Sequence, residues 1–373
     1  MRVGLLQEGD FAGTTLHARY REMINEVALA DELGFSSWGT SEQHFSPPHF
    51  SIASPEVLYA AVAEHTSRIT LRNMSAVLVA YNHPIMVAER IATLDLISNG
   101  RAELCTARSN NLRTLETFQV PTHNTADQWA ESIEVVIKAM SQDTFEHHGE
   151  FWDIQPCEVI PKPLQKPHPA VSVAATSTGS HRKAGRRGIG VISFDNYFGY
   201  GYLDECIREY AEGLNEHGSG NGSGNSDGVN NYFGVYVASA FCAATRSEAI
   251  EVARDATLAY FRFILDLYRK LGQKSSYEYM ANIEGLAEHQ DDMEYMMRAT
   301  ASIMVGTPED FIEQLTDLER RGVDEVLLRV DGFGHEQHIK AIELLGHEVI
   351  PHVDNGDRSV QAREALVGAA KGS

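Results

Sequence analysis

The sequence has no long hydrophobic run and is poor in basic residues. None of its apolar stretches approaches the roughly 18 residues that suggest a membrane-spanning helix. It holds 31 Lys and Arg against 52 Asp and Glu, for a net charge of -21 at pH 7. Because nucleic acids and anionic membrane surfaces repel an acidic protein, we expect neither as a partner.

Cysteine is also scarce. The chain has 373 residues and four cysteines, with no Cys-x-x-Cys pair. They are Cys105, Cys157, Cys206 and Cys242. Such wide spacing indicates reduced thiols rather than a disulfide framework. The first six residues are strand-like and do not resemble a signal peptide, so we expect a cytoplasmic protein.

Two common nucleotide-binding motifs are absent. The chain contains neither of the glycine-rich loops typical of dinucleotide and ATP sites, G-x-G-x-x-G and G-x-x-x-x-G-K-[ST]. A G-x-S-x-G pattern occurs at residues 224–228, but it lies in a run rich in Gly, Ser and Asn rather than between a strand and a helix, so it is not a nucleophile elbow. Any cofactor phosphate must therefore be bound by another kind of loop.

What the sequence does have is an alternation of apolar strand-like runs with helical patterns. The predicted strands are residues 2–7, 36–40, 69–80, 101–107, 170–175, 191–194, 232–244 and 325–330. The predicted helices are 20–33, 55–65, 84–97, 126–140, 181–187, 202–217, 246–271 and 336–345. Eight such units predict an α/β fold, a (β/α)8 TIM barrel with insertions, rather than an open doubly wound sheet. We expect one domain over residues 1–353.

Three segments depart from this rhythm. Residues 218–228 are rich in Gly, Ser and Asn and predict a flexible surface loop. Residues 274–300 are polar and rich in Met and Tyr, which fits either a lid over the barrel mouth or an ordinary helical insertion. Residues 354–373 predict a loosely ordered tail.

Polar residues follow several predicted strands, at the barrel end where reacting groups belong. After the fifth strand, Thr176, Ser177 and Ser180 lead into a helix, whose N-terminus suits a phosphate. Arg108, after the fourth strand, is placed to close the same phosphate from the other side. The alternative interpretation is a plain Ser/Thr cap with no ligand.

Glu42, Gln43 and His44 follow the second strand. His44 beside Glu42 fits a general acid/base, but a histidine packed at the barrel rim fits the local sequence better. Glu42 with His44 and His49 leaves a metal site conceivable. The His147-His148 pair lacks further ligands at matching spacing, and we expect no metal.

The chain resembles the bacterial luciferase-like flavin monooxygenases, the luciferase α subunit in particular, along nearly its whole length. The most specific markers are the stretch from His83-Pro84 to Arg101 and the run Val305-Gly306-Thr307-Pro308-Glu309. Further markers are Gly34-Phe35, Trp38, Glu42-Gln43-His44-Phe45, Ala107-Arg108, Arg187-Gly188 and Val349-Ile350-Pro351.

The resemblance implies FMN bound at the barrel mouth, with its phosphate on Arg108, Thr176, Ser177 and Ser180. It also implies a non-proline cis peptide supporting the flavin at the end of the third strand, which is Ser75-Ala76 here. Ala175 and Phe194 occupy positions that lie beside the flavin in the luciferase. We expect Phe45, Phe50, Phe194 and Tyr197 to make the substrate pocket partly aromatic.

One position departs from the luciferase pattern. The luciferase has Glu-His-His-Phe, and its first histidine is the one implicated in catalysis. That position is Gln43 here, and neighbours on an extended chain point to opposite sides, so His44 does not simply inherit the role. Glutamine can hydrogen-bond an oxygen but cannot act as a base near neutral pH. This difference argues against light emission.

These observations lead to a hypothesis for function. A separate NAD(P)H-dependent reductase supplies reduced FMN, O2 adds to it as a C4a-(hydro)peroxide, and a small organic substrate is oxidised, with Glu42, Gln43 and His44 as the candidate catalytic residues. An oxidoreductase of the same fold using the deazaflavin F420, or a non-catalytic flavin-binding subunit, are the alternatives. The resemblance also implies a dimer.

Overall fold

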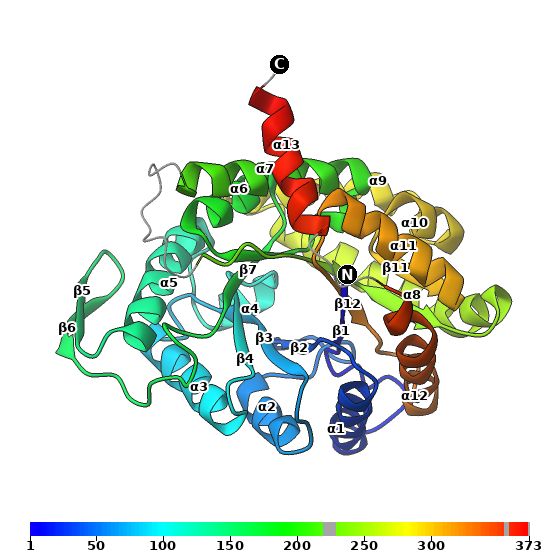
Figure 1. The fold of residues 1–373 in the computed structure, drawn as a ribbon, viewed down its shortest axis with the longest axis horizontal. Helices are drawn as coiled ribbons and strands as arrows, with labels where there is room; N and C mark the ends of the chain where they lie inside the picture. The colour runs from blue at the N-terminus through cyan, green and yellow to red at the C-terminus, as the bar shows by residue number, and fades with distance from the viewer. Residues whose placement is uncertain (219–228, 354–357, 372–373) are drawn as a thin grey trace.

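Eight parallel strands close into a barrel at the centre of the molecule (Figure 1). The computed structural model describes residues 1–218, 229–353 and 358–371. The barrel strands are β1 (Arg2–Leu6), β2 (Ser37–Ser41), β3 (Thr70–Val77), β4 (Ala102–Ala107), β7 (Val171–Ala175), β8 (Gly190–Ser193), β9 (Phe233–Val237) and β12 (Glu325–Arg329). They follow one another around the barrel in chain order, and β12 pairs with β1 to close it. The predicted (β/α)8 fold is confirmed.

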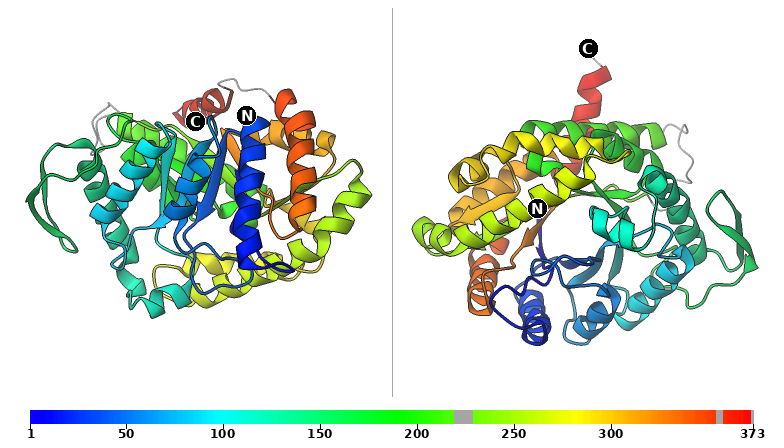
Figure 2. Two further views of the ribbon diagram at one scale, coloured as in Figure 1. Left: turned by 90° about the horizontal axis from the view of Figure 1, so that it is seen from below. Right: turned by 180° about the vertical axis from the view of Figure 1, so that it is seen from behind.

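Helices surround the barrel, so its strands are buried on both faces. All five residues of β2, β9 and β12 are buried, which explains why the sequence of β9 and the centre of β12 are continuous apolar runs rather than alternating ones. The main helices are α1 (Leu16–Glu32), α2 (Pro55–Ala63), α3 (Pro84–Ile97), α5 (Thr125–Ser141), α6 (Thr178–Arg187), α7 (Tyr200–Glu216), α8 (Arg246–Leu271), α11 (Pro308–Arg321) and α12 (His335–Leu344). Figure 2 shows α1 beside α12, next to the strands that close the barrel.

Two small sheets lie outside the barrel and were not predicted. The segment expected as one strand over 232–244 is two, because β10 (Ser239–Cys242) leaves the barrel and pairs with β11 (Ile303–Gly306). Strands β5 (Phe145–His148) and β6 (Asp153–Cys157) form a hairpin. His147 contacts Glu131 there at 3.1 Å, while His148 contacts Asp153 at 2.6 Å. The two histidines thus pair with different carboxylates.

The marker run from Val305 to Glu309 has a structural explanation. It ends β11 and starts α11, where the Thr307 side chain accepts a hydrogen bond from the Asp310 backbone N–H and the Asp310 carboxylate accepts one from the Thr307 backbone N–H. Pro308 occupies the first turn, where a missing N–H costs nothing.

The C-terminal segment differs from the loose tail that we expected. Arg358–Lys371 form α13, which packs on α7 and α11. The buried Arg363 guanidinium lies 3.0 Å from the Asp324 carboxylate. Residues 354–357, and residues 219–228 of the predicted loop, lie outside the described residues.

Helices α6 and α7 pack closely against each other. A Cβ at Gly185 would overlap the backbone carbonyl oxygen of Tyr210, and one at Gly213 would overlap that of Arg182. Glycine at both positions therefore lets the two backbones touch. This contact holds α6, which follows directly after β7, against α7.

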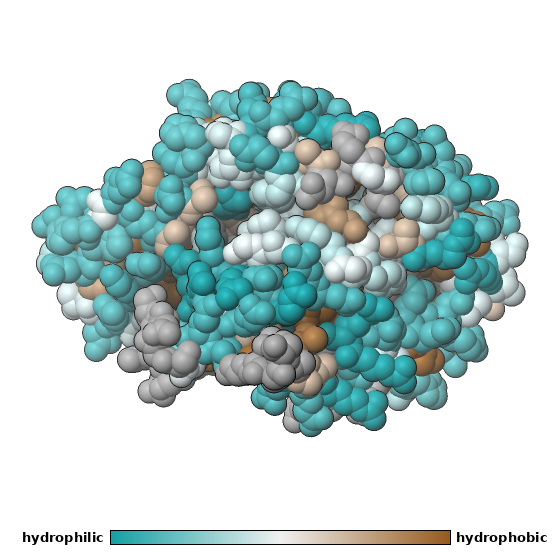
Figure 3. All heavy atoms as spheres, turned by 90° about the horizontal axis from the view of Figure 1, so that it is seen from above, coloured by the Kyte–Doolittle hydropathy of each residue, from teal (hydrophilic) through white to brown (hydrophobic). Residues whose placement is uncertain are grey.

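The surface of the protein is polar, as the net charge of the sequence leads one to expect. No described helix is both long and apolar enough to cross a membrane. The face seen from above in Figure 1 is mostly hydrophilic, and its apolar residues form small areas (Figure 3).

Candidate active site

A cavity of 720 Å³ lies at the carboxyl ends of the barrel strands. Its wall combines residues that end or follow the strands with residues of α8 and of the segment after α8, which is yellow below the strands in the left view of Figure 2. The volume is within the range of sites for small molecules and cofactors. In a barrel of this kind the carboxyl end is where active sites lie.

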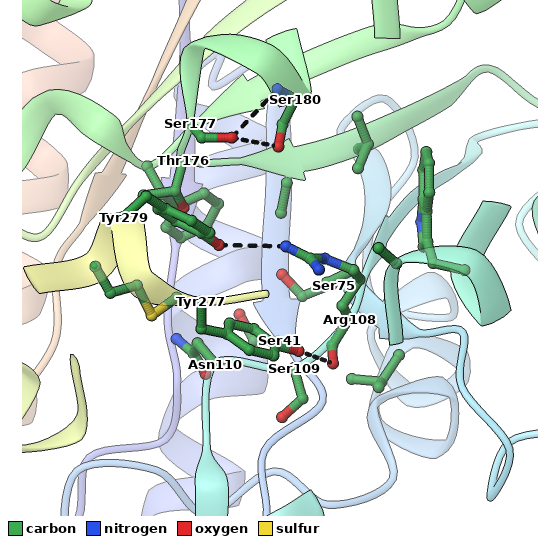
Figure 4. A pocket seen from close by; sticks show the side chains of 18 of the residues that line it. Ser41, Ser75, Arg108, Ser109, Asn110, Thr176, Ser177, Ser180, Tyr277 and Tyr279 are labelled. Carbon is green, nitrogen blue, oxygen red and sulfur yellow. Dashed lines mark hydrogen bonds between the residues drawn. The ribbon is translucent and has the colours of Figure 1, made fainter. Parts of the chain in front are cut away.

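The N-terminus of α6 forms one part of the wall (Figure 4). Ser177 caps the helix, accepting a hydrogen bond from the Ser180 backbone N–H at 3.2 Å, and the two side-chain oxygens lie 2.7 Å apart. Gly179 also lines the cavity, and a Cβ there would meet no atom within 4 Å. The first N–H groups of a helix have no partner within it and carry positive potential. This open helix start suits an anionic group such as a phosphate.

His181 holds the start of α6 in place. Its ring nitrogens contact the Ser177 carbonyl oxygen at 2.8 Å and the Ser193 hydroxyl at 3.2 Å. Burial lowers the pKa of His181 to about 4, so the ring is neutral at pH 7. The cap is thereby tied to the neighbouring strand β8.

Arg108 lies in the same part of the cavity, and the segment after α8 covers it (Figure 4). Its guanidinium donates to the Ser276 hydroxyl at 2.9 Å and to the Tyr279 hydroxyl at 3.4 Å, and it lies 4.8 Å from the centre of the Tyr277 ring. The Tyr277 hydroxyl donates to the Arg108 carbonyl oxygen at 3.2 Å. The first part of the segment 274–300 is therefore a wall of the cavity. That this wall opens as a lid stays a prediction.

The sequence matches the luciferase-like monooxygenase family over residues 1–325. The chain belongs to this family. The predicted family is thus confirmed, and the protein is an enzyme of the luciferase-like monooxygenase class.

Two relatives match this luciferase-like monooxygenase along most of their length. The oxygenase component of a flavin-dependent trigonelline monooxygenase from Acinetobacter baylyi is 27% identical over 94% of each chain. An FMNH2-dependent dimethylsulfone monooxygenase from Pseudomonas putida is 24% identical over 92% of this chain and 87% of its own. Two other curated relatives match over 54% and 47% of their own length.

A solved structure supports the fold. The oxygenating constituent of 3,6-diketocamphane monooxygenase from Pseudomonas putida, in complex with FMN, superposes with a TM-score of 0.75. It covers 95% of this chain and 99% of its own, at 22% identity. At this identity the likeness establishes the barrel alone.

The end of β3 differs from what the luciferase resemblance implied. Among the described residues the cis peptides all precede a proline, so the Ser75-Ala76 peptide is trans and that prediction was wrong. Instead Ser75 has φ of 59°, and the pairing of β3 with β4 shifts between Asn73 and Ala76. This bulge re-aims the strand, so that Ser75 lines the cavity and Ala76 does not.

Glu42, Gln43 and His44 have separate positions. The Glu42 carboxylate lines the cavity but accepts from the Val77 N–H at 3.1 Å and the Tyr81 hydroxyl at 2.8 Å, and it contacts His44 at 3.3 Å. Gln43 lines the cavity, with its side-chain nitrogen 3.5 Å from the Asn110 side-chain oxygen. The His44 ring packs against Tyr81, Phe45 and Phe118 and is not among the lining residues. The geometry therefore favours the rim interpretation of His44.

Of the remaining predicted residues, some line the cavity and others lie outside it. Thr176, Phe194, Phe50 and Tyr197 line the cavity. Ala175 is buried behind it, and Phe45 is exposed and outside it.

The residues proposed for a metal do not assemble. His44 pairs with Glu42, whereas His49 pairs with Asp10 at 2.8 Å. Within the described parts of the chain, one group gathers three potential metal ligands, Glu22, Glu26 and His335, and it does not line the cavity. Arg19 lies 3.0 Å from Glu26 and already compensates its charge.

Sequence reasoning missed two sets of lining residues. One is basic and belongs to α6: Lys183, Arg186 and Arg187. Their spacing of three and four residues places them on one helix face, a signal the sequence contained. The other set surrounds the buried carboxylate of Glu8, which follows β1.

Proposed function

We propose that this protein is the oxygenase component of a two-component monooxygenase that uses reduced FMN and O2. One observation carries the proposal: Arg108 lines the same cavity as Ser177 and Ser180 at the N-terminus of α6. The donor set fits a phosphate, and the open space above Gly179 leaves room for it. When bound, reduced FMN supplies the electrons that activate O2. The two full-length relatives are flavin-dependent by name, which supports this choice of cofactor.

Different residues of the cavity wall would then contact the phosphate, the flavin ring and the substrate. Arg108, Thr176, Ser177 and Ser180 hold the phosphate. Ser75 and Phe194 line the cavity further in and are candidates to contact the flavin ring. The Gln43 amide is placed to hydrogen-bond an oxygen of the substrate.

Tyr277 and Tyr279 cover Arg108 on one side of the cavity and would limit the access of water to it. A dry site protects a reactive oxygen species from hydrolysis and side reactions. Since an oxygenase of this kind must receive its flavin already reduced, we propose a separate NAD(P)H-dependent reductase as partner. The name of one relative, an oxygenase component, is consistent with that.

The phosphate assignment is tested by comparing FMN with riboflavin, which lacks the phosphate. We expect Arg108→Ala to weaken FMN binding about 10- to 100-fold, the effect of a charge-assisted hydrogen bond of roughly 1.5–3 kcal/mol, and to leave riboflavin binding unchanged. Fluorescence titration under anaerobic conditions measures both ligands. Arg113→Ala, an exposed arginine outside the cavity wall, is the control.

Two results would contradict the proposal. Equal losses of affinity for FMN and riboflavin would show that Arg108 does not bind the phosphate. Tighter binding of F420 than of FMN would favour a hydride-transferring oxidoreductase.

A further inference from the structure

The cavity has two chemically different ends. Arg108 and the start of α6 follow β4 and β7, and the Lys183 and Arg187 side chains add positive charge there, whereas Arg186 is paired with Glu216. In the order β1-β12-β9-β8-β7-β4-β3-β2, strand β1 lies four places from β7, directly across the closed barrel. The end near β1 and β9 holds the Glu8 carboxylate and a group of tyrosines, Tyr197, Tyr236, Tyr260 and Tyr268.

Glu8 is held mainly by neutral donors. It is 3% exposed, and its oxygens accept from the Ser41 hydroxyl at 3.0 Å and the Tyr260 hydroxyl at 2.9 Å. The Tyr236 hydroxyl lies 2.7 Å from that of Tyr260 and extends this series of hydrogen-bonded hydroxyl groups. One hydroxyl donor on each oxygen leaves acceptor capacity on both, because a carboxylate offers about four lone-pair sites.

The cation nearest to Glu8 is shared with other carboxylates. Arg329 approaches Glu8 at 3.7 Å without a hydrogen bond, and it also faces Asp10 at 3.4 Å and Asp331 at 3.8 Å. Arg19 contacts Asp331 at 3.1 Å but is also paired with Glu26. This buried group therefore has more carboxylates than guanidinium groups.

The titratable and charged groups around Glu8 come from every element packed against it. They are Arg329 and Asp331 at the end of β12, Asp10 after β1, with His49 2.8 Å from Asp10, Tyr236 of β9, Tyr260 of α8 and Tyr197 after β8. Burial raises the pKa of Glu8 to about 7. Glu8 thus readily takes up a proton at neutral pH, because burial outweighs the attraction of the Arg329 charge.

The surrounding side chains are aromatic. Phe50 and Phe194 line the cavity together with the four tyrosines. Aromatic rings offer apolar surface and, over their faces, negative potential that attracts organic cations. A neutral polar ligand would gain only a hydrogen bond from Glu8, whereas a cation would also gain the Coulomb attraction of a weakly screened charge.

We propose that the Glu8 end of the cavity binds the nitrogen-centred cation of an organic substrate, either a protonated amine or a quaternary or N-alkylated nitrogen. As the substrate site of a monooxygenase it rests on the proposed function, but the binding preference itself does not require FMN. The phosphate end and the cation end would then accept their ligands independently.

Three benzyl or phenyl probes of similar size test this on the purified full chain by calorimetry. They are benzyltrimethylammonium, benzyl alcohol and benzoate. We expect the cation to bind at least tenfold more tightly than either other probe at pH 8. Glu8→Gln should remove this preference, and Glu8→Asp should retain part of it.

The pH dependence supplies a sharper readout, because benzyltrimethylammonium keeps its charge at every pH. Its affinity should fall about tenfold per unit as the pH drops below the pKa of Glu8, with protons released on binding, and it should be flat in Glu8→Gln. Tyr260→Phe keeps the ring but removes a donor to the carboxylate, so it should move the midpoint to higher pH. This variant keeps the test valid if Glu8→Gln folds poorly.

Other outcomes overturn the proposal. Cation binding that is independent of pH or unchanged in Glu8→Gln would place the cation elsewhere. Tighter binding of benzyl alcohol than of the cation would mean that Glu8 acts as a neutral hydrogen-bonding group. FMN titrations on the same variants separate the two proposals. Glu8→Gln should keep wild-type FMN affinity, and a protein that binds the cation but not FMN would refute the proposed function alone.

Discussion

Among single residues, Glu8 links the cavity to the stability of the fold. Burial raises the pKa of its carboxyl from about 4.5 in the unfolded chain to about 7. Between these values the folded protein binds a proton that the unfolded chain does not. The contribution of Glu8 to the free energy of unfolding is therefore fully present below about pH 4.5 and is lost as the pH rises through about 7.

Replacing Glu8 by glutamine should abolish this dependence. We expect the free energy of unfolding of Glu8→Gln, relative to wild type, to increase by up to about 3 kcal/mol between pH 5 and pH 8, since one pKa unit corresponds to roughly 1.4 kcal/mol. Urea denaturation at the two pH values measures the change. Glu205→Gln, at a half-exposed surface position, should show no such trend. A parallel trend in both variants would mean that Glu8 is not the titrating group.

At the scale of elements, the start of α6 is the part of the site that the chain specifies most locally. Gly179 has open space beside its α-carbon, so a larger side chain strains nothing in the empty protein. We expect Gly179→Val to fold with a melting temperature close to wild type but to bind FMN at least tenfold more weakly, because its side chain occupies the proposed phosphate space. Gly201→Val, another helical glycine with nothing within 4 Å of its Cβ, is the matched control. Normal FMN affinity in Gly179→Val would show that the phosphate does not bind at the N-terminus of this helix.

Local signals explain which elements could be predicted. The α6 cap depends on Ser177 and Ser180, three residues apart, so the sequence indicated it directly. Strands β10 and β11 pair across more than sixty residues, with four residues each, and no local pattern announces such a pairing. Glu8 was missed for a similar reason. Its role depends on Ser41, Tyr260 and Arg329, which come from three other βα units.

The His44 prediction shows a different limit. Sequence order places His44 next to Gln43, and an extended chain points neighbours in opposite directions, which the structure follows for these two residues. What the sequence could not show is the cluster of Tyr81 and Phe118 that receives the His44 ring. The bulge at Ser75 was equally hidden, since its φ of 59° is not a residue-type signal for serine.

For the whole molecule, a buried ion pair joins two strands of the barrel. Glu325 on β12 lies 2.9 Å from Arg72 on β3, and the Ser37 and Tyr232 hydroxyls donate to it at 2.6 and 2.8 Å. Burial alone would raise the pKa of Glu325, but the charge of Arg72 lowers it to about 2. The carboxylate therefore stays ionised at the amino-terminal end of the barrel.

Removing one partner of this pair should be costly. We expect Arg72→Met to lower the free energy of unfolding by about 3–5 kcal/mol, because it leaves a buried charge unpaired. The double variant Arg72→Met with Glu325→Gln should recover part of that loss. Arg321→Ala, which removes a half-exposed partner of Asp204, should cost less than about 1 kcal/mol. Chemical denaturation measures all three, and equal losses for Arg72→Met and Arg321→Ala would show that the buried pair does not stabilise closure.

The placement of Arg108 and Glu8 after different strands of the barrel has a consequence for how such an enzyme changes over evolution. The phosphate end is built mainly by the units of β4 and β7, and the Glu8 end mainly by those of β1, β9 and β12, while α8 and the segment after it contribute tyrosines to both. Mutations in the β1 and β12 units can therefore change the Glu8 end without altering the residues proposed to hold the phosphate. Related enzymes with this arrangement can change their substrate and keep the same cofactor. The substrate specificity of the enzyme can likewise be engineered by substitutions on the β1 side of the barrel.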